Sequence, residues 1–253
     1  MKARWCIYLL TGIFLLAVLS GTISTVTGAQ SRAADDDDED ALEDPLPSWV
    51  DLRVFIHRPR ELRPRDLGSC VPTANDNVNH FGETPWQLSG PIVWRLNRST
   101  VPSSVAGSVD SVLNQAAEAW YSGIFSQGPD TSARRARFDN VNAILWKRLG
   151  RSTVGVTFVW FSRLTGEVFE VDTVFNKRHP WAIFADSPEC QGSPIAYDLL
   201  NIATHEFGHW VGLDDLYDDL DKDLTMYGFS AGGEIKKRTL GRGDIIGKNE
   251  LEP

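Results

Sequence analysis

Two histidines and a glutamate, closely spaced, are the residues of this chain best suited to chemistry. In His205-Glu206-x-x-His209 the histidines are four residues apart, so on a helix their imidazoles project from the same face. Two imidazoles one turn apart can bind a single zinc ion. Glu206 would lie about 100° around the helix from His205, beside the metal, where a carboxylate can act as a general base on a metal-bound water.

The residues after the second histidine predict a turn and a third ligand. Gly212 comes where the helix must end, because glycine accepts the left-handed conformation that lets the chain reverse. After this reversal Asp215 can return toward the metal, and its neighbour Asp214 is the competing candidate. Zinc bound by two histidines and one carboxylate keeps a fourth position for water, which is the pattern of catalytic sites.

This segment and a second one resemble the metzincin metallopeptidases. In that clan, as in residues 204–215, a glycine turn and a third metal ligand follow the histidine helix. Leu224-Thr225-Met226-Tyr227-Gly228 is similar to the methionine turn beneath the zinc, with Met226 as its apolar floor. The resemblance is closest to matrixin-like secreted peptidases and covers roughly residues 86–251. It implies that this chain is a zinc metallopeptidase.

The third ligand separates this sequence from most matrixins. That family places the ligand six residues after the second histidine, which is Asp215 here and implies that Asp214 turns to solvent or to a contact behind the ligands. Matrixins usually have histidine at this position, whereas snapalysin-like relatives have aspartate. An anionic ligand leaves less positive charge on the site, so the metal should be a somewhat weaker Lewis acid.

The resemblance implies an exported zinc endopeptidase. Zinc lowers the pKa of its water toward about 7, and Glu206 would take the water's proton and later pass it to the leaving amine. The alternative function is a non-catalytic exported binding domain that keeps the metallopeptidase fold. Glu206 favours the peptidase, because a binding domain has no need of a general base.

The fold implied by the resemblance is α+β. A twisted, mostly parallel β-sheet with an antiparallel edge strand would pack on two long helices, followed by a C-terminal helix. An apolar stripe from Val105 to Trp120 predicts a helix of about five turns, capped by Ser103 or Ser104. Ser193-Pro194 should begin the metal-binding helix. Alternating apolar residues predict strands at 91–96, 142–149, 153–161 and 166–176.

The last of these strands, residues 166–176, is similar to the matrixin edge strand and precedes the pair Pro180-Trp181. In that family a peptide substrate adds to this edge as an extra strand, with main-chain hydrogen bonds giving affinity. The resemblance therefore implies a peptide or protein partner bound along an edge strand. The alternative is an ordinary edge strand protected by Glu167, Glu170 and Asp172.

The N-terminal part of the chain is predicted to lie outside the catalytic fold. Two basic residues precede an apolar run over 7–26, and small residues follow it, so residues 1–29 are predicted to be a secretory signal peptide. A membrane anchor facing outside is the alternative for this run. Four prolines, at 45, 47, 59 and 64, predict an irregular backbone. The other predicted parts are an acidic disordered linker (30–50), an N-terminal arm or propeptide-like segment (51–85) and a metallopeptidase domain (86–253).

Charge narrows the classes of partner. The formal net charge is −9, and removing residues 1–29, which carry two basic and no acidic residues, makes it −11. An acidic protein repels the phosphate backbone, so no nucleic-acid partner is expected. Separately, we expect the protein to be secreted and monomeric. The run 35–40 should be solvated. The acidic loop 214–223 is a second candidate cation site, for calcium held by oxygen ligands.

Two cysteines remain once the leader is removed. Cys70 and Cys190 are an even pair in an oxidising compartment, which predicts one disulfide between the N-terminal arm and the segment before the metal-binding helix. The competing interpretation is a resemblance of the residues around Cys70 to the matrixin cysteine switch, in which a thiolate occupies the open position on zinc. His80 and His179 are predicted to lie outside the metal site.

Overall fold

The computed structural model describes residues 45–60, 78–86, 88, 90–185 and 195–251, all within one compact unit, Ala34–Pro253. The predicted leader, most of the acidic linker, Cys70 and Cys190 lie outside the described residues, so the leader, the anchor and the disulfide stay predictions. Among the described helices, none has both the length and the apolar character needed to cross a lipid bilayer.

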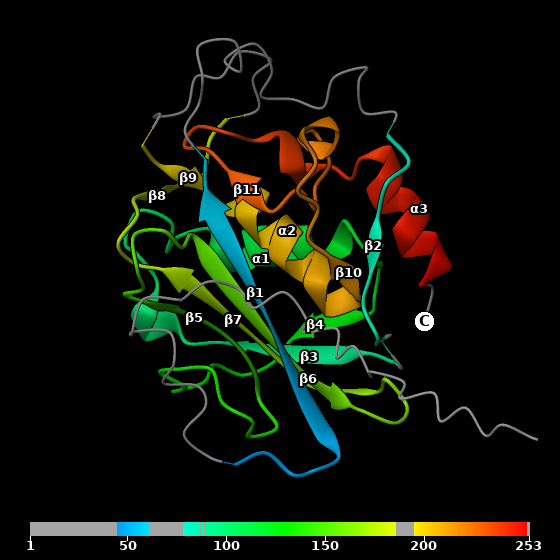
Figure 1. The fold of residues 1–253 in the computed structure, drawn as a ribbon. Helices are drawn as coiled ribbons and strands as arrows, with labels where there is room; N and C mark the ends of the chain where they lie inside the picture. The colour runs from blue at the N-terminus through cyan, green and yellow to red at the C-terminus, as the bar shows by residue number, and fades with distance from the viewer. Residues whose placement is uncertain (1–44, 61–77, 87, 89, 186–194, 252–253) are drawn as a thin grey trace, which may run out of the picture. The chain divides into compact units, whose positions relative to one another are not determined.

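In the described part of the chain, seven strands form one mixed sheet (Figure 1). Their order across the sheet is β11-β1-β6-β7-β5-β3-β4. The strands are β1 (Val50–Pro59), β3 (Ile92–Leu96), β4 (Phe125–Gln127), β5 (Asn142–Lys147), β6 (Gly155–Ser162), β7 (Val168–Asn176) and β11 (Phe229–Ser230). Four neighbouring pairs are parallel, whereas β6 is antiparallel to both of its neighbours. The prediction of an α+β fold with a mostly parallel sheet is therefore confirmed.

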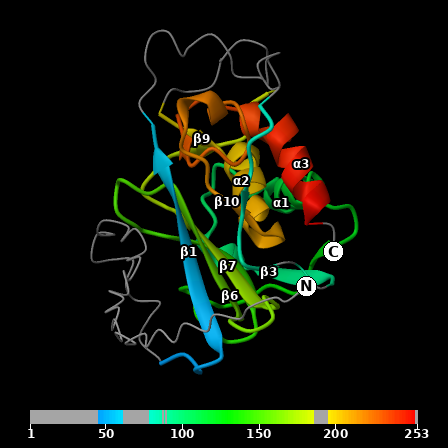
Figure 2. The same ribbon diagram turned by 45° about the vertical axis from the view of Figure 1, so that its right-hand side comes forward.

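Three α-helices and several shorter elements complete the described structure. Figure 2 shows α1 and α2 on the same side of the sheet, and side chains from both helices and the sheet share one hydrophobic core. The helices are α1 (Val109–Glu118), α2 (Leu199–Val211) and α3 (Arg242–Glu250). Two-residue strands form two small sheets, β2 (Gly82–Glu83) with β10 (Leu213–Asp214) and β8 (Trp181–Ala182) with β9 (Tyr197–Asp198). Short 3-10 helices lie at Arg98–Thr100, Asp219–Asp221 and Lys236–Arg238.

The prediction of two long helices is wrong. α1 has 10 residues and begins after Ser108, because the preceding residues, which include Gly107, form turns and glycine and serine favour helices poorly. α2 has 13 residues and begins after Asp198, whose carboxylate accepts a hydrogen bond from the Asn201 amide at 2.8 Å. The predicted start at Ser193-Pro194 lies outside the described residues, and strand β9 separates it from the helix.

Strand β6 is buried on both faces, as predicted. Because side chains alternate along a strand, Val156 and Phe158 pack into one hydrophobic core with Val50 of β1. Val159 and Phe161 pack into the other core, which includes the helices. The sheet thus separates two cores, and the larger one lies under α1 and α2.

The prediction that residues 166–176 form an edge strand is wrong. β7 lies between β5 and β6, and the outermost described strands of this sheet are β11 and β4. Glu170 and Asp172 are buried and do not protect an exposed edge. Glu170 accepts a hydrogen bond from the Asp139 amide at 2.8 Å, and Asp172 accepts one from the Ala143 amide at 2.6 Å. Their carboxylates satisfy backbone donors of the loop that precedes and enters β5, which is why acidic residues occur in an interior strand.

The segment predicted as an irregular N-terminal arm contributes two strands, β1 and β2. β1 pairs antiparallel with β6 from Val50↔Ser162 to His57↔Gly155. At its end Arg58 and Pro59 pair parallel with β11. Pro45 and Pro47 lie before β1 and Pro59 is its last residue, so these three bound the strand and do not prevent it, whereas Pro64 lies outside the described residues. Whether any of this segment is removed as a propeptide stays a prediction.

Candidate metal centre

Helix α2 brings the two predicted histidine ligands together in the core. The Nε2 atoms of His205 and His209 are 3.2 Å apart, and both side chains are fully buried. The helix ends at Gly212, which has a φ of 109° in the left-handed region, so the predicted glycine turn is confirmed. A Cβ at Gly212 would approach the Trp86 carbonyl oxygen to 2.8 Å, which makes glycine necessary there for a second reason.

The chain reversal after α2 places Asp215 beside both histidines. Its Oδ1 lies 3.2 Å from Nε2 of His205 and 3.6 Å from Nε2 of His209. Its Oδ2 accepts a hydrogen bond from the Tyr217 hydroxyl at 3.0 Å. Asp214 points elsewhere and forms an ion pair with Arg53. The structure therefore groups His205, His209 and Asp215 and leaves Asp214 outside this group.

The hydrogen bonds of the two histidines define which nitrogen each presents. Nδ1 of His205 lies 2.8 Å from the Thr225 carbonyl oxygen, and Nδ1 of His209 lies 2.9 Å from the Leu213 carbonyl oxygen. A carbonyl can only accept, so each Nδ1 carries the proton and each Nε2 presents a lone pair. Burial lowers the pKa of His209 to about 3 and that of His205 well below its ordinary value. Both imidazoles are therefore neutral, as metal ligands must be.

These lone pairs and the aspartate oxygen form a donor set that fits a metal ion. Oδ1 of Asp215 is buried and has no hydrogen-bond partner among the described residues. Two lone pairs and a carboxylate oxygen this close repel one another unless a cation lies between them. Zinc bonds of about 2.0–2.1 Å in a tetrahedral site put ligand atoms about 3.3 Å apart. The observed separations of 3.2, 3.2 and 3.6 Å match this value without rearrangement.

Met226, the methionine of the predicted turn, packs against helix α2. Its side chain is 1% exposed and packs against α2 at Gly208, between the two histidines in sequence. A Cβ at Gly208 would overlap the Met226 sulfur, so the close approach requires glycine. Met226 thus packs its apolar side chain against the helix that carries both histidines.

Asp244 holds the methionine loop in place. Its carboxylate accepts hydrogen bonds from the amides of Thr225 at 2.7 Å, Met226 at 3.0 Å and Gly241 at 2.7 Å. The bond to the Gly241 amide also caps the first turn of α3. The bonds to the Thr225 and Met226 amides hold the segment whose Thr225 carbonyl accepts from His205. One buried carboxylate on α3 therefore helps to orient a candidate metal ligand.

Glu206 is oriented by a chain of buried hydroxyl groups. Its Oε2 accepts a hydrogen bond from the Thr157 hydroxyl at 2.6 Å. Thr157 and Thr173 are joined at 2.8 Å, and the Trp210 indole donates to Thr173 at 2.9 Å. Because an indole can only donate, the donors run from Trp210 through Thr173 and Thr157 to Glu206. Oε1 of Glu206 has no partner among the residues described, so one oxygen is held and the other is free to accept a proton.

The buried position of Glu206 sets its basicity. Burial raises the pKa of Glu206 to about 8, while the Thr157 hydroxyl bond acts in the opposite direction and Asp215 adds to the rise. A cation held by the adjacent ligands would lower this pKa, because it favours the charged carboxylate. Glu206 therefore has the environment of a tuned general base.

Removing the Thr157 hydroxyl should impair the base and spare the ligands. For a reaction in which Glu206 acts as the base, we expect Thr157→Val to lower kcat roughly tenfold or more with KM little changed, because a hydrogen bond to a charged group is worth about 1.5–3 kcal/mol. The acidic limb of the pH profile should also move to higher pH, since this bond lowers the pKa of Glu206.

Thr204→Val is the matched control for that measurement. Thr204 is equally buried on α2, and its hydroxyl donates to the Leu200 carbonyl at 2.8 Å, away from Glu206. This control should keep the wild-type pH profile. An unshifted profile in Thr157→Val, or an equal shift in both variants, would contradict the orienting role.

His57 of β1 also lies in this site, although nothing in the sequence pointed to it. Its ring packs edge-on against His205 with centroids 3.9 Å apart, and its Nδ1 is 3.8 Å from Oε1 of Glu206. Neither ring nitrogen has a hydrogen-bond partner in the described chain. His57 lies about 150 residues before the motif and shares no spacing with it. With His205 and Glu206, His57 forms a second group of close, buried atoms that could hold a metal ion. His80 and His179 belong neither to this group nor to that of His205, His209 and Asp215.

The acidic loop after α2 does not form a second group of ligands among the described residues. Asp221 pairs with His80 at 2.8 Å, and Asp223 pairs with Lys236 at 3.1 Å. These carboxylates have separate partners. Calcium binding stays a prediction without a described site.

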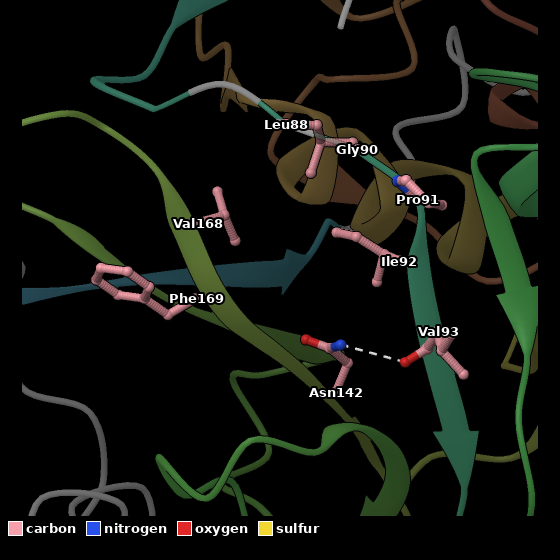
Figure 3. Close-up of a pocket in the computed structure, with 8 residues that line it drawn as sticks. All are labelled: Leu88, Gly90, Pro91, Ile92, Val93, Asn142, Val168 and Phe169. Carbon is pink, nitrogen blue, oxygen red and sulfur yellow. Dashed lines mark hydrogen bonds between the residues drawn. The ribbon is translucent and has the colours of Figure 1, made fainter.

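A surface pocket of about 300 Å³ lies elsewhere, between β3 and β7 (Figure 3). Its lining includes Ile92, Asn142 and Phe169, and the Asn142 side chain donates to the Val93 carbonyl at 3.1 Å. The described lining contains neither histidine nor carboxylate.

Within the described residues, this histidine–carboxylate group lies next to a buried glutamate, Glu206, with one oxygen that has no hydrogen-bond partner there. No protein-family model matches the chain, and a search of curated proteins finds no match.

Proposed function

We propose that this protein is a zinc-dependent endopeptidase of the metzincin kind, exported from the cell. The observation that carries the proposal is the triangle formed by Nε2 of His205, Nε2 of His209 and Oδ1 of Asp215. Its dimensions suit zinc, and Glu206 follows His205 with one oxygen free. The glycine turn and Met226 beneath the helix support the resemblance to matrixin-like peptidases.

The residues of the chain divide the chemical work between them. A zinc ion held by His205, His209 and Asp215 would polarise a peptide carbonyl and acidify a water. Glu206 accepts that water's proton on Oε1, because Thr157 keeps Oε2 engaged and holds the carboxylate from rotating. Glu206 then delivers the proton to the leaving amine, which completes hydrolysis of the peptide bond.

The alternative function is a binding domain that keeps the fold and the metal. A binding domain would need the three ligands but not a buried carboxylate with a free oxygen and a row of three donors behind it. Burying Glu206 costs stability, because a buried unpaired carboxylate oxygen loses its hydration. A general base would explain why this cost is kept, whereas a binding domain would gain nothing from it. This cost favours the peptidase.

Hydrolysis and metal dependence test the proposal together. The purified protein should bind one zinc ion per chain and cleave quenched peptides from a mixed library at internal bonds. A chelator should stop cleavage, and added zinc should restore it. Cleavage that survives full removal of the metal would contradict the proposal, and so would failure to bind a stoichiometric zinc ion.

A further inference from the structure

The loop that carries Asp215 is joined to the segment around Met226 by main-chain hydrogen bonds. The Leu216 amide donates to the Met226 carbonyl at 2.8 Å, and the Gly228 amide donates to the Leu216 carbonyl at 2.9 Å. These bonds form a short parallel bridge one residue beyond the proposed third ligand. The position of the Asp215 carboxylate therefore depends on where residues 226–228 lie.

Gly228 lies directly against the Asp215 carboxylate. A Cβ at Gly228 would come within 3.2 Å of Oδ1 of Asp215 and within 2.6 Å of a ring carbon of Tyr217. The Tyr217 hydroxyl holds the other carboxylate oxygen, Oδ2. Aspartate is shorter than histidine, so its loop must approach the metal position closely, and a glycine permits this approach. A shift of the glycine segment would therefore move the ligand atom.

Lys237 binds this segment on either side of Gly228. Its side chain is fully buried, and its Nζ donates hydrogen bonds to the carbonyl oxygens of Tyr227 and Phe229, the latter at 2.9 Å. An ammonium group has three donors and no acceptor, so one lysine can hold both carbonyls. The backbone that encloses the Asp215 carboxylate is thus fixed by the ammonium of a single side chain.

The main chain of Lys237 contacts the helix that carries the two histidines. Its amide donates to Oδ1 of Asn201 at 2.7 Å, and Asn201 is buried on α2, one turn before His205. One residue therefore contacts both structures that supply the proposed ligands. Its amide is joined to the helix of His205 and His209, and its ammonium is joined to the segment that encloses the aspartate.

A buried lysine is a costly residue for this position. Burial lowers the pKa of Lys237 to about 7, because the charged form loses its hydration. A methionine of similar length would occupy the same space without burying a charge. Core stability alone therefore gives little reason for a lysine here, whereas the two carbonyl bonds beside the third ligand give one.

We propose that Lys237 is a positioning residue of the metal site, which sets the distance between the third ligand and the two histidines. It ties residues 227–229 to α2 and so holds Oδ1 of Asp215 at 3.2 and 3.6 Å from Nε2 of His205 and of His209. This inference rests on the zinc site of the proposed function, but it does not depend on peptide hydrolysis.

A double-mutant cycle between Lys237 and Asp215 tests the inference. Lys237→Met removes the donors and Asp215→Ala removes the ligand, and zinc affinity is measured by competition with a chromophoric chelator. We expect Lys237→Met to weaken zinc binding about 10–100-fold when Asp215 is present, and by less than about threefold when residue 215 is alanine. Loss of the ammonium charge acts on the ion in both backgrounds, so most of that effect cancels in the comparison.

Lys236→Met is the matched control, because Lys236 is also buried but its ammonium donates to Asp223 at 3.1 Å. This control should keep the zinc affinity of the wild type. A metal-free crystal structure of Lys237→Met gives a second measurement. Oδ1 of Asp215 should lie about 0.5 Å or more farther from Nε2 of His205 than in the wild type, which is enough to spoil a ligand set.

Equal losses of zinc affinity in the two Asp215 backgrounds, or no loss in either, would overturn the inference and leave the proposed peptidase standing. Strong coupling in a protein that binds zinc but cleaves no peptide would refute the peptidase and leave the positioning role standing. A wild type that binds no zinc would overturn both. If Lys237→Met does not fold, the cycle is run with Lys237→Gln, whose side chain is one bond shorter, and the same outcomes decide.

Discussion

Replacing Glu206 with glutamine should abolish peptide hydrolysis and leave zinc binding almost unchanged. The amide carbonyl oxygen can still accept the hydrogen bond from the Thr157 hydroxyl, so the amide nitrogen takes the place of Oε1. The reacting water then faces an amide group, which cannot take its proton. A general base contributes about 10²–10⁴-fold to rate, so kcat/KM should fall by about that factor. Zinc affinity, measured by competition with a chromophoric chelator, should stay within about threefold of the wild-type value, because Glu206 is not one of the three proposed ligands.

Glu170→Gln is the matched control for this change. Glu170 is another buried glutamate, but it lies on β7 and accepts hydrogen bonds from loop amides, and it does not belong to the groups His205–His209–Asp215 or His57–His205–Glu206. It should keep wild-type kcat/KM. Substantial hydrolysis by Glu206→Gln would remove Glu206 from the chemistry, and an equal loss in Glu170→Gln would show that the effect is structural.

The two adjacent aspartates should differ strongly in their effect on zinc. Asp215→Ala removes one of three ligand atoms, and we expect it to weaken zinc binding by more than the roughly 10–100-fold that loss of an outer hydrogen-bond partner causes. Asp214→Ala breaks only the ion pair with Arg53, so zinc affinity should stay within a few-fold of the wild-type value. Competition titration at fixed pH measures both.

Asp215→Asn refines this comparison, because it keeps a neutral oxygen at the same position. Its zinc affinity should lie between those of the wild type and Asp215→Ala. If Asp214→Ala lost zinc while Asp215→Ala kept it, the register of the third ligand would be wrong and the resemblance to the metzincin motif would be correspondingly weaker.

Local spacing allowed the centre of the site to be predicted. Helical periodicity places His205 and His209 on one face, and glycine chemistry requires the turn at Gly212, so this part of the prediction needed no distant contact. Met226 was found through a second short motif. Each of these signals lies within a few residues of sequence, where backbone geometry alone determines which side chains meet.

What could not be predicted depends on pairing between distant segments. β1 meets β6 about 100 residues later, and no local pattern specifies that register, so His57 went unnoticed beside Glu206. The lack of a local signal for strand pairing also explains why residues 166–176 were wrongly predicted to form an edge strand. Glu170 suggested an exposed edge, whereas its carboxylate binds the Asp139 amide in a loop whose approach is decided by the tertiary fold.

The complete burial of β6 has a consequence for the solubility of any form in which β1 has left. All eight of its residues are buried, and Val156, Phe158 and Trp160 on one face would then border an unpaired row of backbone donors and acceptors. A long apolar edge of this kind is a template for pairing with another chain. A molecule from which β1 had detached would therefore tend to pair with its own copies through this exposed edge and to aggregate.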